Sequence, residues 1–572
     1  MCLLALAVFI LLSGLDDLFI GIMFLWSRRD RFPWPSADEL ERAPEKRIAI
    51  LVPLWHEHRV IGRMLEHNLS SISYSNFEVF VGVYPNDPLT LRAVADVAAR
   101  YPNVHLARVG HDGPTSKGDC LNALHRQMEQ HEMRSGNRFE TVVTHDAEDV
   151  LHPQSLRLIS WFSANYEMVQ IPVLPLATGA EWTHGLYCDE FAEFQSKDIP
   201  VRQRLGGFLP ANGVGTGFAR AALSRIASQR AGEVFDPQSL TEDYETGFRL
   251  HAMGCRQVFV PVHFDSAGPI ATREYFPRNL RAAVRQRSRW VAGIALQGWQ
   301  RHGWRGSWSR RYWFWRDRKG LTGNLIAPVA NLLYVHGLIA GSHLALPSWI
   351  LAATFASSFV QLGLRMLCVA RIYGARFAAG VPLRAIWGNL LNCLATLVAL
   401  HQFLRARAAA VDLKWRKTEH VYPALGDATH PRPRLGELLV HRRCLGPEEL
   451  EAALREKPFG LKLGEHLIHR EQITEEALYQ TLSFQGGLPF GLPPRRDVNP
   501  HATRCLPGAA LRRWKAFPYR VALGQLHILT ADLPSPQMMR ELAGLSRLEM
   551  RFRLVRPRDL ESLARQYPPS ML

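Results

Sequence analysis

The chain has 572 residues, of which 47% are hydrophobic and 21% are charged, so it is long enough for two or more domains with full cores. Its net charge of +16 indicates anionic partners such as phosphates, nucleotides or a membrane surface. No zinc-finger spacing or RNA-binding motif occurs, so nucleic acid is not an expected partner. The eight cysteines are scattered singly with no CxxC pair, which fits a reducing cytosol and gives no sign of a disulfide scaffold or a zinc site.

Residues 2–26 form an apolar run that ends at Trp26 and is followed by arginines. We predict a transmembrane anchor whose C-terminal end lies in the cytoplasm, not a cleaved signal peptide. Asp16 and Asp17 lie near its middle, where carboxylates are costly and face protein or water. The alternative is that Met1 is an internal start and the true span begins upstream.

From Arg47 to about Val262, apolar strands alternate with helical patterns at about 57–70, 89–100, 117–132 and 153–165. This alternation predicts an α/β fold with a mainly parallel, doubly wound sheet. Ligands bind such sheets at the carboxyl ends of the strands. The predicted strands are RIAILVPLW (47–55), FEVFVGVY (77–84), NVHLARV (103–109), ETVVTHDAED (140–149), MVQIPVLP (168–175) and RQVFVPV (256–262).

Polar residues follow the ends of these strands in a fixed order. Each of them alone has a plainer explanation, because a strand-end Asp more often caps a turn or a helix and a lone Lys is usually solvated. Together they predict a binding site at one edge of the sheet. They are Pro53, Glu57, Asp87, Lys117, Asn122, Asp146 and Glu148.

Two further stretches lie near the predicted site. NGVGTGF (212–218) fits neither the dinucleotide fingerprint nor the P-loop, and we interpret it as a tight loop lining the acceptor side. EWTHGLYCDEF (181–191) is aromatic and acidic, and it either shapes the acceptor site or only packs.

Asp243 is predicted to lie in the first turn of a helix that Gly254 ends. Ser239 and Glu242 have the spacing of a capping box. The N-terminus of a helix favours the charged form of a carboxylate, so Asp243 is a candidate base.

Gln286, Arg289 and Trp290 are spaced so that a helix places them on one face. A guanidinium there can grip a diphosphate with two hydrogen bonds, and an indole can stack on a sugar. The alternative is a solvated basic helix, since Arg281, Arg285 and Arg289 repeat every four residues.

This ordered set resembles the inverting, often processive glycosyltransferases of the cellulose and hyaluronan synthase class. The resemblance implies catalytic roles for Asp243, Glu242, Gln286, Arg289 and Trp290, and donor-nucleotide binding by Pro53, Glu57, Asp87, Lys117, Asn122 and Asp146. It also implies that Asp146 and Glu148 bind Mg²⁺ or Mn²⁺, with Asp149 as the alternative to Glu148. His56 and Glu148 depart from the usual Asn and Asp.

The segment after residue 300 has the composition of a membrane region. Trp, Tyr and Arg crowd 301–320, as at a cytoplasmic membrane interface, and the apolar stretches 323–345 and 348–370 are long enough to span. Residues 381–405 contain Asn389, Asn392 and Thr396 on one face. A span here would place everything after it outside the cytoplasm, and we expect the next domain to be cytoplasmic, so we predict an amphipathic helix lying in the interface.

After a polar linker at 411–433, a short motif occurs twice. RLGELLV (434–440) is echoed by KLGEHLI (462–468), and each copy precedes an acidic-start helix. A predicted hairpin, a helix, a strand and a last helix at 557–566 form a small α/β companion half.

The repeat resembles the cyclic di-GMP-binding domain of secretion and pilus ATPases. Arg443, Glu471 and Lys457 depart from that pattern, and the alternative is a helical protein–protein docking module. The resemblance implies ligand binding by Arg434, Leu435, Gly436, Leu439, Leu450, Leu454, Leu463, Gly464, Leu467, Leu478, Leu482 and Gln485.

The whole order resembles the bacterial phage-adsorption protein B family. This implies an inner-membrane processive transferase that makes an exopolysaccharide from a nucleotide-diphosphate sugar, favouring UDP, with cyclic di-GMP as activator. Expected partners are a polysaccharide or lipid acceptor, membrane lipids and an export partner in the outer envelope. The alternatives are a non-processive lipid-carrier transferase and a non-enzymatic scaffold or phage-receptor component. The predicted parts are an anchor (1–26), a transferase domain (45–300), a membrane region (301–410), a linker (411–433) and a cyclic di-GMP-type domain (434–572).

Overall fold

The computed structural model describes residues 2–27, 32–177, 182–265, 268–340, 347–409, 435–441, 444–458, 461–486 and 488–567. The chain divides into two compact units. The first comprises Met1–Ile61 and Tyr74–Val421, and the second comprises Gly62–Ser73 and Tyr422–Leu572.

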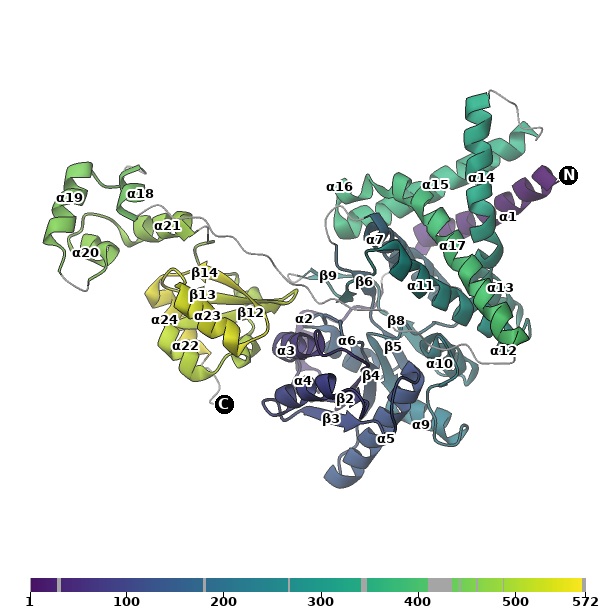
Figure 1. Cartoon of the computed structure of the whole chain (residues 1–572), viewed down its shortest axis with the longest axis horizontal. Coiled ribbons are helices and arrows are strands. Elements are labelled where there is room, and N and C mark those ends of the chain that lie inside the picture. The colour runs from purple at the N-terminus through teal and green to yellow at the C-terminus, as the bar shows by residue number, and fades with distance from the viewer. Residues whose placement is uncertain are drawn as a thin grey trace. The chain divides into compact units, whose positions relative to one another are not determined.

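A seven-stranded sheet forms the core of the first unit, in the order β3-β2-β1-β4-β7-β5-β8 (Figure 1). Adjacent strands run parallel except at β7, which is antiparallel to both β4 and β5. Strand β1 is apolar and almost wholly buried, as expected for a strand covered on both faces. The predicted doubly wound sheet is therefore confirmed. Its strands are β1 (Ile48–Pro53), β2 (Phe77–Val83), β3 (Val104–Arg108), β4 (Thr141–Thr144), β5 (Met168–Gln170), β7 (Thr216–Ala219) and β8 (Gln257–Phe259).

The four predicted helices between these strands are present, and their first turns lie where the strands end. The Ser116 hydroxyl accepts a hydrogen bond from the Asp119 amide at 3.2 Å and starts α5, which Gly136 ends with φ of 72°. The helices are α3 (Ile61–Ser71), α4 (Pro88–Ala98), α5 (Lys117–Ser135) and α6 (Ser155–Phe162).

The interpretation of 212–218 as a loop is wrong in its second half. Gly213 and Gly215 turn the chain with φ of 75° and 60°, and β7 then begins at Thr216 and enters the sheet. The glycines obscured this strand because they carry no side chain that shows an alternating pattern.

Most of the aromatic and acidic stretch forms α7 (Trp182–Glu193), which continues as a π-helix over Phe194–Asp198. The two motif helices are α10 (Glu242–Ala252) and α11 (Leu280–Trp290). A second π-helix, Val291–Gln297, follows α11 directly.

Four long helices gather on one side of the first unit (Figure 1). They are α1 (Cys2–Ser27), α14 (Gly320–Ala340), α15 (Ser348–Tyr373) and α17 (Val381–Ala408). Leu6–Ser27, Ser348–Tyr373 and Val381–Ala408 are long and apolar enough to cross a membrane, by length and composition alone. The predicted span 323–345 coincides with α14 as far as Ala340, and 341–346 lie outside the described residues.

Helix α17 is the segment for which we predict a position in the membrane interface. Length and composition would also allow it to cross. Asn392 accepts a hydrogen bond from Arg287 of α11 at 2.7 Å, and Thr396 accepts one from Asn324 of α14 at 3.0 Å. The polar face of α17 is thus turned toward protein, and the interface position stays a prediction.

Asp16 and Asp17 of α1 also face protein. Helix α13 (Trp308–Arg318) brings the Tyr312 hydroxyl to 2.8 Å from Asp16 Oδ1. The Lys319 ammonium lies 2.8 Å from Asp16 Oδ2 and 2.6 Å from Asp17 Oδ1. These pairs balance carboxylates that would otherwise be costly in an apolar helix.

The second unit contains the tandem repeat and a three-stranded sheet, as predicted from its sequence. The repeat forms α18 (Leu435–His441), α19 (Pro447–Glu456), α20 (Leu463–His469) and α21 (Glu475–Gly486). The sheet has the order β12-β13-β14. The strands are β12 (Ala516–Ala522), β13 (Gln525–Thr530) and β14 (Glu549–Leu554), and the helices of this part of the chain are α22 (Gly508–Trp514), α23 (Pro536–Leu545) and α24 (Pro557–Gln566).

Most of α3 belongs to this second unit. Its Glu66 carboxylate accepts a hydrogen bond from the Arg547 amide at 2.8 Å, and the Ser71 carbonyl accepts one from Asn499 at 3.0 Å.

Candidate active site

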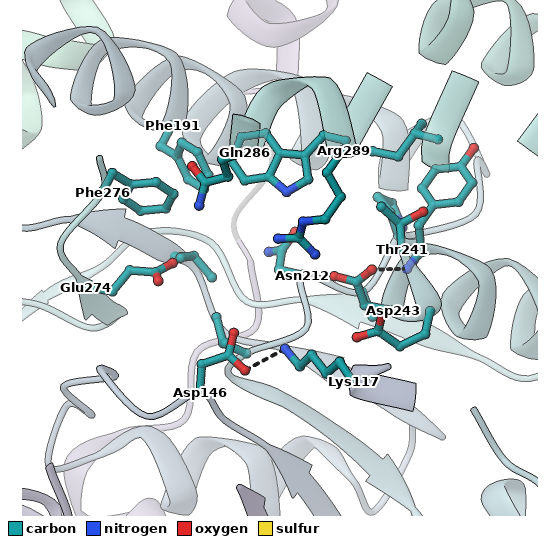
Figure 2. Close-up of a pocket in the computed structure, with 18 of the residues that line it drawn as sticks. Lys117, Asp146, Phe191, Asn212, Thr241, Asp243, Glu274, Phe276, Gln286 and Arg289 are labelled. Atoms are coloured by element: carbon teal, nitrogen blue, oxygen red, sulfur yellow. Dashed lines mark hydrogen bonds and ion pairs between the residues drawn. The ribbon is translucent and has the colours of Figure 1, made fainter. Parts of the chain in front are cut away.

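A cavity of about 600 Å³ lies where β1, β2 and β4 end, and α10 and α11 complete its wall. Figure 2 shows Asp146 and Lys117 on one side, with Asp243 and Arg289 directed into the same space. Ten of the twelve residues predicted to act in catalysis, donor binding or metal binding line this cavity, although they come from distant parts of the chain. They are Pro53, Glu57, Lys117, Asp146, Glu148, Glu242, Asp243, Gln286, Arg289 and Trp290.

Lys117 is the cation at the centre of one wall. Its ammonium lies 2.6 Å from Asp146 Oδ1 and donates to the Gly213 carbonyl at 3.3 Å. Burial alone would lower the pKa of Lys117, but Asp146, Glu242 and Asp243 surround it and raise that pKa. Lys117 is therefore held charged, in a position to meet an anionic ligand.

Glu242 and Asp243 start α10, but the predicted capping box is not formed. Thr241 is the N-cap residue, and its side chain makes no capping hydrogen bond. Asp243 Oδ1 accepts from the Tyr244 amide at 2.8 Å. Burial raises the pKa of Asp243, while burial and the neighbouring Asp243 raise the pKa of Glu242 to about 7. The two carboxyls are buried side by side on the cavity wall, and a raised pKa is the property of a group that takes up a proton.

Gly213 fits between the two charged walls. A Cβ atom at this position would lie 2.7 Å from Asp243 Oδ2 and 3.2 Å from Lys117 Nζ. The glycine-rich loop therefore lies beside the candidate base and the central lysine, and its place on the acceptor side stays a prediction.

Helix α11 presents Gln286, Arg289 and Trp290 to the cavity, as their spacing predicts. The Arg289 guanidinium also donates to the Leu240 carbonyl at 3.4 Å, next to the start of α10. Arg287 is not part of the cavity lining; it is buried and pairs with Glu190 of the cavity wall at 2.7 Å. Arg287 therefore fixes α11, and Arg289 is left for the cavity.

Trp290 belongs to an aromatic group. Its ring centroid lies 6.1 Å from that of Tyr187, 6.2 Å from that of Phe191 and 6.4 Å from that of Phe276. Phe191, Phe276 and Trp290 line the cavity, so one wall offers flat apolar surfaces of the kind that stack on sugar rings.

The acidic side chains around Asp146 suit a hard cation. Glu148 lies on the cavity wall, whereas Asp149 turns away to His145 Nδ1 at 2.7 Å and to the Asp146 amide at 3.0 Å. This geometry favours Glu148 over Asp149 as the partner of Asp146. Glu274 adds a third carboxyl to the wall, and burial together with Asp149, Glu148 and Asp146 raises its pKa well above the usual range. Such a crowd of oxygen donors fits Mg²⁺ or Mn²⁺.

Asp87 and Asn122 are not among the residues that line the cavity, and their contact with the nucleotide stays a prediction. Asp87 accepts from the Thr90 amide at 3.3 Å as the N-cap of α4, and from the His56 amide at 2.6 Å. Asn122 bonds the backbone of Phe235, donating at 2.8 Å and accepting at 2.9 Å. Both side chains are used to hold loops beside the site.

Several residues of the cavity wall were not predicted from the sequence. Glu274 ends the three-residue strand β11 (Thr272–Glu274), Phe276 lies two residues beyond it, and Glu190 lies in a stretch whose role was left open. Nothing in their local pattern marks them. The wall continues to an ion-pair group that includes Glu193, Asp198, Arg316 and Arg365.

Equivalent glycines and leucines of the two copies of the repeat make equivalent packing contacts. A Cβ on Gly436 would lie 2.7 Å from Leu450, and a Cβ on Gly464 would lie 2.6 Å from Leu478. Leu439 and Leu467 are fully buried, Leu435, Leu463 and Leu482 pack against that core, and Leu454 is exposed. Arg434 and the side chain of Gln485 lie outside the described residues.

Comparison with protein families matches both units. Residues 44–293 match the glycosyltransferase like family 2, and residues 486–572 match the MshEN domain. Among solved structures, MshE with cyclic di-GMP (cdg) is 28% identical and covers 24% of this chain and 99% of its own, with a TM-score of 0.23. The mannosyltransferase PcManGT from Pyrobaculum calidifontis, in complex with GDP-Man and Mn²⁺, is 18% identical and covers 68% and 99%, with a TM-score of 0.44.

A curated relative extends over nearly the whole chain. The bacteriophage adsorption protein B of Escherichia coli (strain K12) is 36% identical over 586 residues, which cover 95% of this chain and 78% of the relative. The resemblance inferred from the motifs is confirmed, and the chain belongs to the bacteriophage adsorption protein B family.

Proposed function

We propose that this protein is an inverting, processive glycosyltransferase of the bacterial inner membrane that extends an exopolysaccharide and responds to cyclic di-GMP. The observation that carries the proposal is the convergence of Lys117, Asp146, Asp243 and Arg289 on one cavity of a glycosyltransferase family 2 domain. Phosphate-binding cations and a candidate base in one cavity are the groups that transfer from a nucleotide-diphosphate sugar requires.

Asp243 is the proposed general base. It takes the proton from the acceptor hydroxyl as that oxygen attacks the sugar, and one displacement of this kind inverts the configuration at the sugar carbon. The Tyr244 amide bonds one Asp243 oxygen and orients the carboxylate. Glu242, whose pKa is about 7, supports the same proton transfer from the adjacent position.

Lys117 and Arg289 are the proposed partners of the donor diphosphate. Lys117 is held charged by its carboxylate neighbours, and Arg289 approaches from α11. A divalent cation, which Asp146 and Glu148 would hold, supplies further positive charge to the leaving diphosphate when bound. The donor is proposed to be a UDP-sugar.

The acceptor is proposed to lie against Phe191, Phe276 and Trp290. Their rings line the cavity on the side of α7 and α11, and both helices pack against α17. A polysaccharide bound there would lie beside the candidate membrane helices. This position suits a polysaccharide that is exported while it is extended. A lipid-linked acceptor is the alternative, and an outer-envelope export partner would take over the product.

The C-terminal unit is proposed to bind cyclic di-GMP as an activator. The tandem motif, the MshEN match and the name of the solved MshE structure support this role. Activation requires that the ligand favour one of two arrangements of the chain over the other.

The test is an assay of the purified full chain with UDP- and GDP-sugars, each with and without cyclic di-GMP. We expect release of nucleoside diphosphate with one donor, products of many lengths, and a higher rate with cyclic di-GMP. A single added sugar would support the lipid-carrier alternative. No release with any donor, while an Asp243→Asn protein keeps every cellular phenotype, would support the scaffold.

A further inference from the structure

A second polar cluster lies apart from the cavity, near the amino ends of β2 and β3. It consists of Glu78, His105 and His131, whose ligand atoms all lie within 4.8 Å of one another. Among the residues that the structure describes, it is the one group of His, Cys, Asp and Glu that meets this criterion. All three side chains are partly exposed, so an ion can reach them from solvent.

The fold brings these side chains together by regular packing. Phe80 and His105 are register partners on adjacent strands, and Glu78 shares a face with Phe80 because side chains alternate along β2. His131 reaches the same face from α5. The Phe80 ring lies 4.9 Å from the His105 ring and 5.6 Å from the His131 ring, so it orients both imidazoles.

The two imidazoles converge on one carboxylate oxygen. His105 Nε2 lies 2.6 Å and His131 Nε2 lies 3.0 Å from Glu78 Oε2. In a tetrahedral zinc site with bonds of about 2.0–2.1 Å, neighbouring ligand atoms are roughly 3.3 Å apart. Small outward movements of the three side chains would therefore make room for an ion between them.

We propose that Glu78, His105 and His131 form a binding site for Zn²⁺ or a similar first-row divalent cation, with water as the fourth ligand. Imidazole nitrogen selects this class of metal, whereas the oxygen donors of the cavity suit Mg²⁺ or Mn²⁺. The two sites thus differ in chemistry as well as in place.

Arg47 is the competing cation, and it gives the proposal a specific test. Its guanidinium contacts Glu78 Oε1, the oxygen that the imidazoles do not share, and Nη2 lies 3.4 Å from His131 Nε2. A metal on Oε2 leaves the Arg47 contact in place, but the two positive charges repel. Removing the charge in Arg47→Gln should therefore tighten metal binding.

A metal here would fasten the C-terminal half of α5 to two strands of the sheet. The same helix begins at Lys117, so the ion would stabilise the element that supplies the central lysine of the cavity. A ligand that binds only the folded chain raises the unfolding temperature as it saturates.

The test uses the full chain with Asp146→Asn and Glu148→Gln, which removes the two proposed metal ligands of the cavity. The protein is treated with chelator and then titrated with ZnCl₂. We expect one bound zinc per chain, a rise in unfolding temperature, and loss of both in a His105→Gln, His131→Gln protein. The matched control is His111→Gln, since His111 also pairs with a carboxylate, Asp119 at 3.2 Å, but lies outside the cluster. This control should keep the zinc.

Three results would overturn the proposal: the same zinc content in the double His variant, weaker binding in Arg47→Gln, or no tetrahedral Co²⁺ absorption in the unsubstituted chain. The Co²⁺ spectrum needs no variant, so it decides the question even if the His substitutions impair folding. None of these results depends on glycosyl transfer.

Discussion

The cavity and the tandem repeat were both predicted from short motifs, but their motif residues have different roles in the structure. In the cavity, charged motif residues such as Lys117, Asp243 and Arg289 form part of the lining. In the repeat, Leu439 and Leu467 form the core. Burying charge is costly without a partner, so a buried charged motif indicates a ligand. Buried leucines stabilise a fold in any case, so a leucine and glycine motif indicates a fold first.

The largest effect on the rate of sugar transfer is expected from Asp243→Asn, because the asparagine amide cannot take the proton from the acceptor hydroxyl. The rate of transfer should fall about 10²- to 10⁴-fold with the fold intact. Nucleoside diphosphate release measures it, and Asp96→Asn, an exposed Asp on α4, is the control. If Asp243→Asn transferred sugar at the rate of the unsubstituted protein, Asp243 would not be the general base.

Gly213→Ala should lower activity about tenfold or more. The new Cβ would meet Asp243 Oδ2 at 2.7 Å, and φ of 75° costs about 1–2 kcal/mol for a non-glycine residue. Gly136→Ala carries the same backbone strain at φ of 72°, with nothing within 4 Å of its Cβ. If both substitutions lower activity equally, the Asp243 contact has no role and backbone strain explains the loss.

The acid limb of the pH–rate profile should lie near pH 7 in the unsubstituted protein. Glu242 has a pKa of about 7, raised by burial and by Asp243, and the two carboxyls titrate as a pair. Removing one negative charge in Glu242→Gln lowers the pKa of its partner, so activity should persist to lower pH by about one unit. A shift to higher pH would contradict the assignment of the pair.

In the repeat, Gly464→Ala should act on stability. Its Cβ would approach Leu478 to 2.6 Å, and overpacking costs about 1–3 kcal/mol. We expect a lower unfolding temperature and a weaker response to cyclic di-GMP, while transfer without the nucleotide is unchanged. Gly544→Ala in α23, where nothing lies within 4 Å, is the control and should be neutral or slightly stabilising.

The smallest effect is expected from Leu454→Ala. Leu454 is 53% exposed, so its loss should change the unfolding temperature little. If the side chain meets the nucleotide, the affinity for cyclic di-GMP falls while stability holds. Equal affinity in the variant would leave Leu454 without a binding role.

Periodic patterns predicted much of this structure. The alternation of apolar runs predicted the order of strands and helices, and spacing of three and four residues placed Gln286, Arg289 and Trp290 on one face. These inferences succeed because they depend on local geometry.

The errors depend on contacts between distant segments. Glu274 reaches the cavity from a three-residue strand, and glycines obscured β7. No local pattern encodes which loop a side chain will meet, so such roles require the fold.

The cavity is proposed to transfer sugar by inversion. The anomeric configuration of the product can be measured by NMR, with the purified chain and the donor that releases nucleoside diphosphate. We expect a glycosidic bond whose configuration is opposite to that of the donor, formed by the unsubstituted protein and not by Asp243→Asn. Retention of the donor's configuration would rule out inversion.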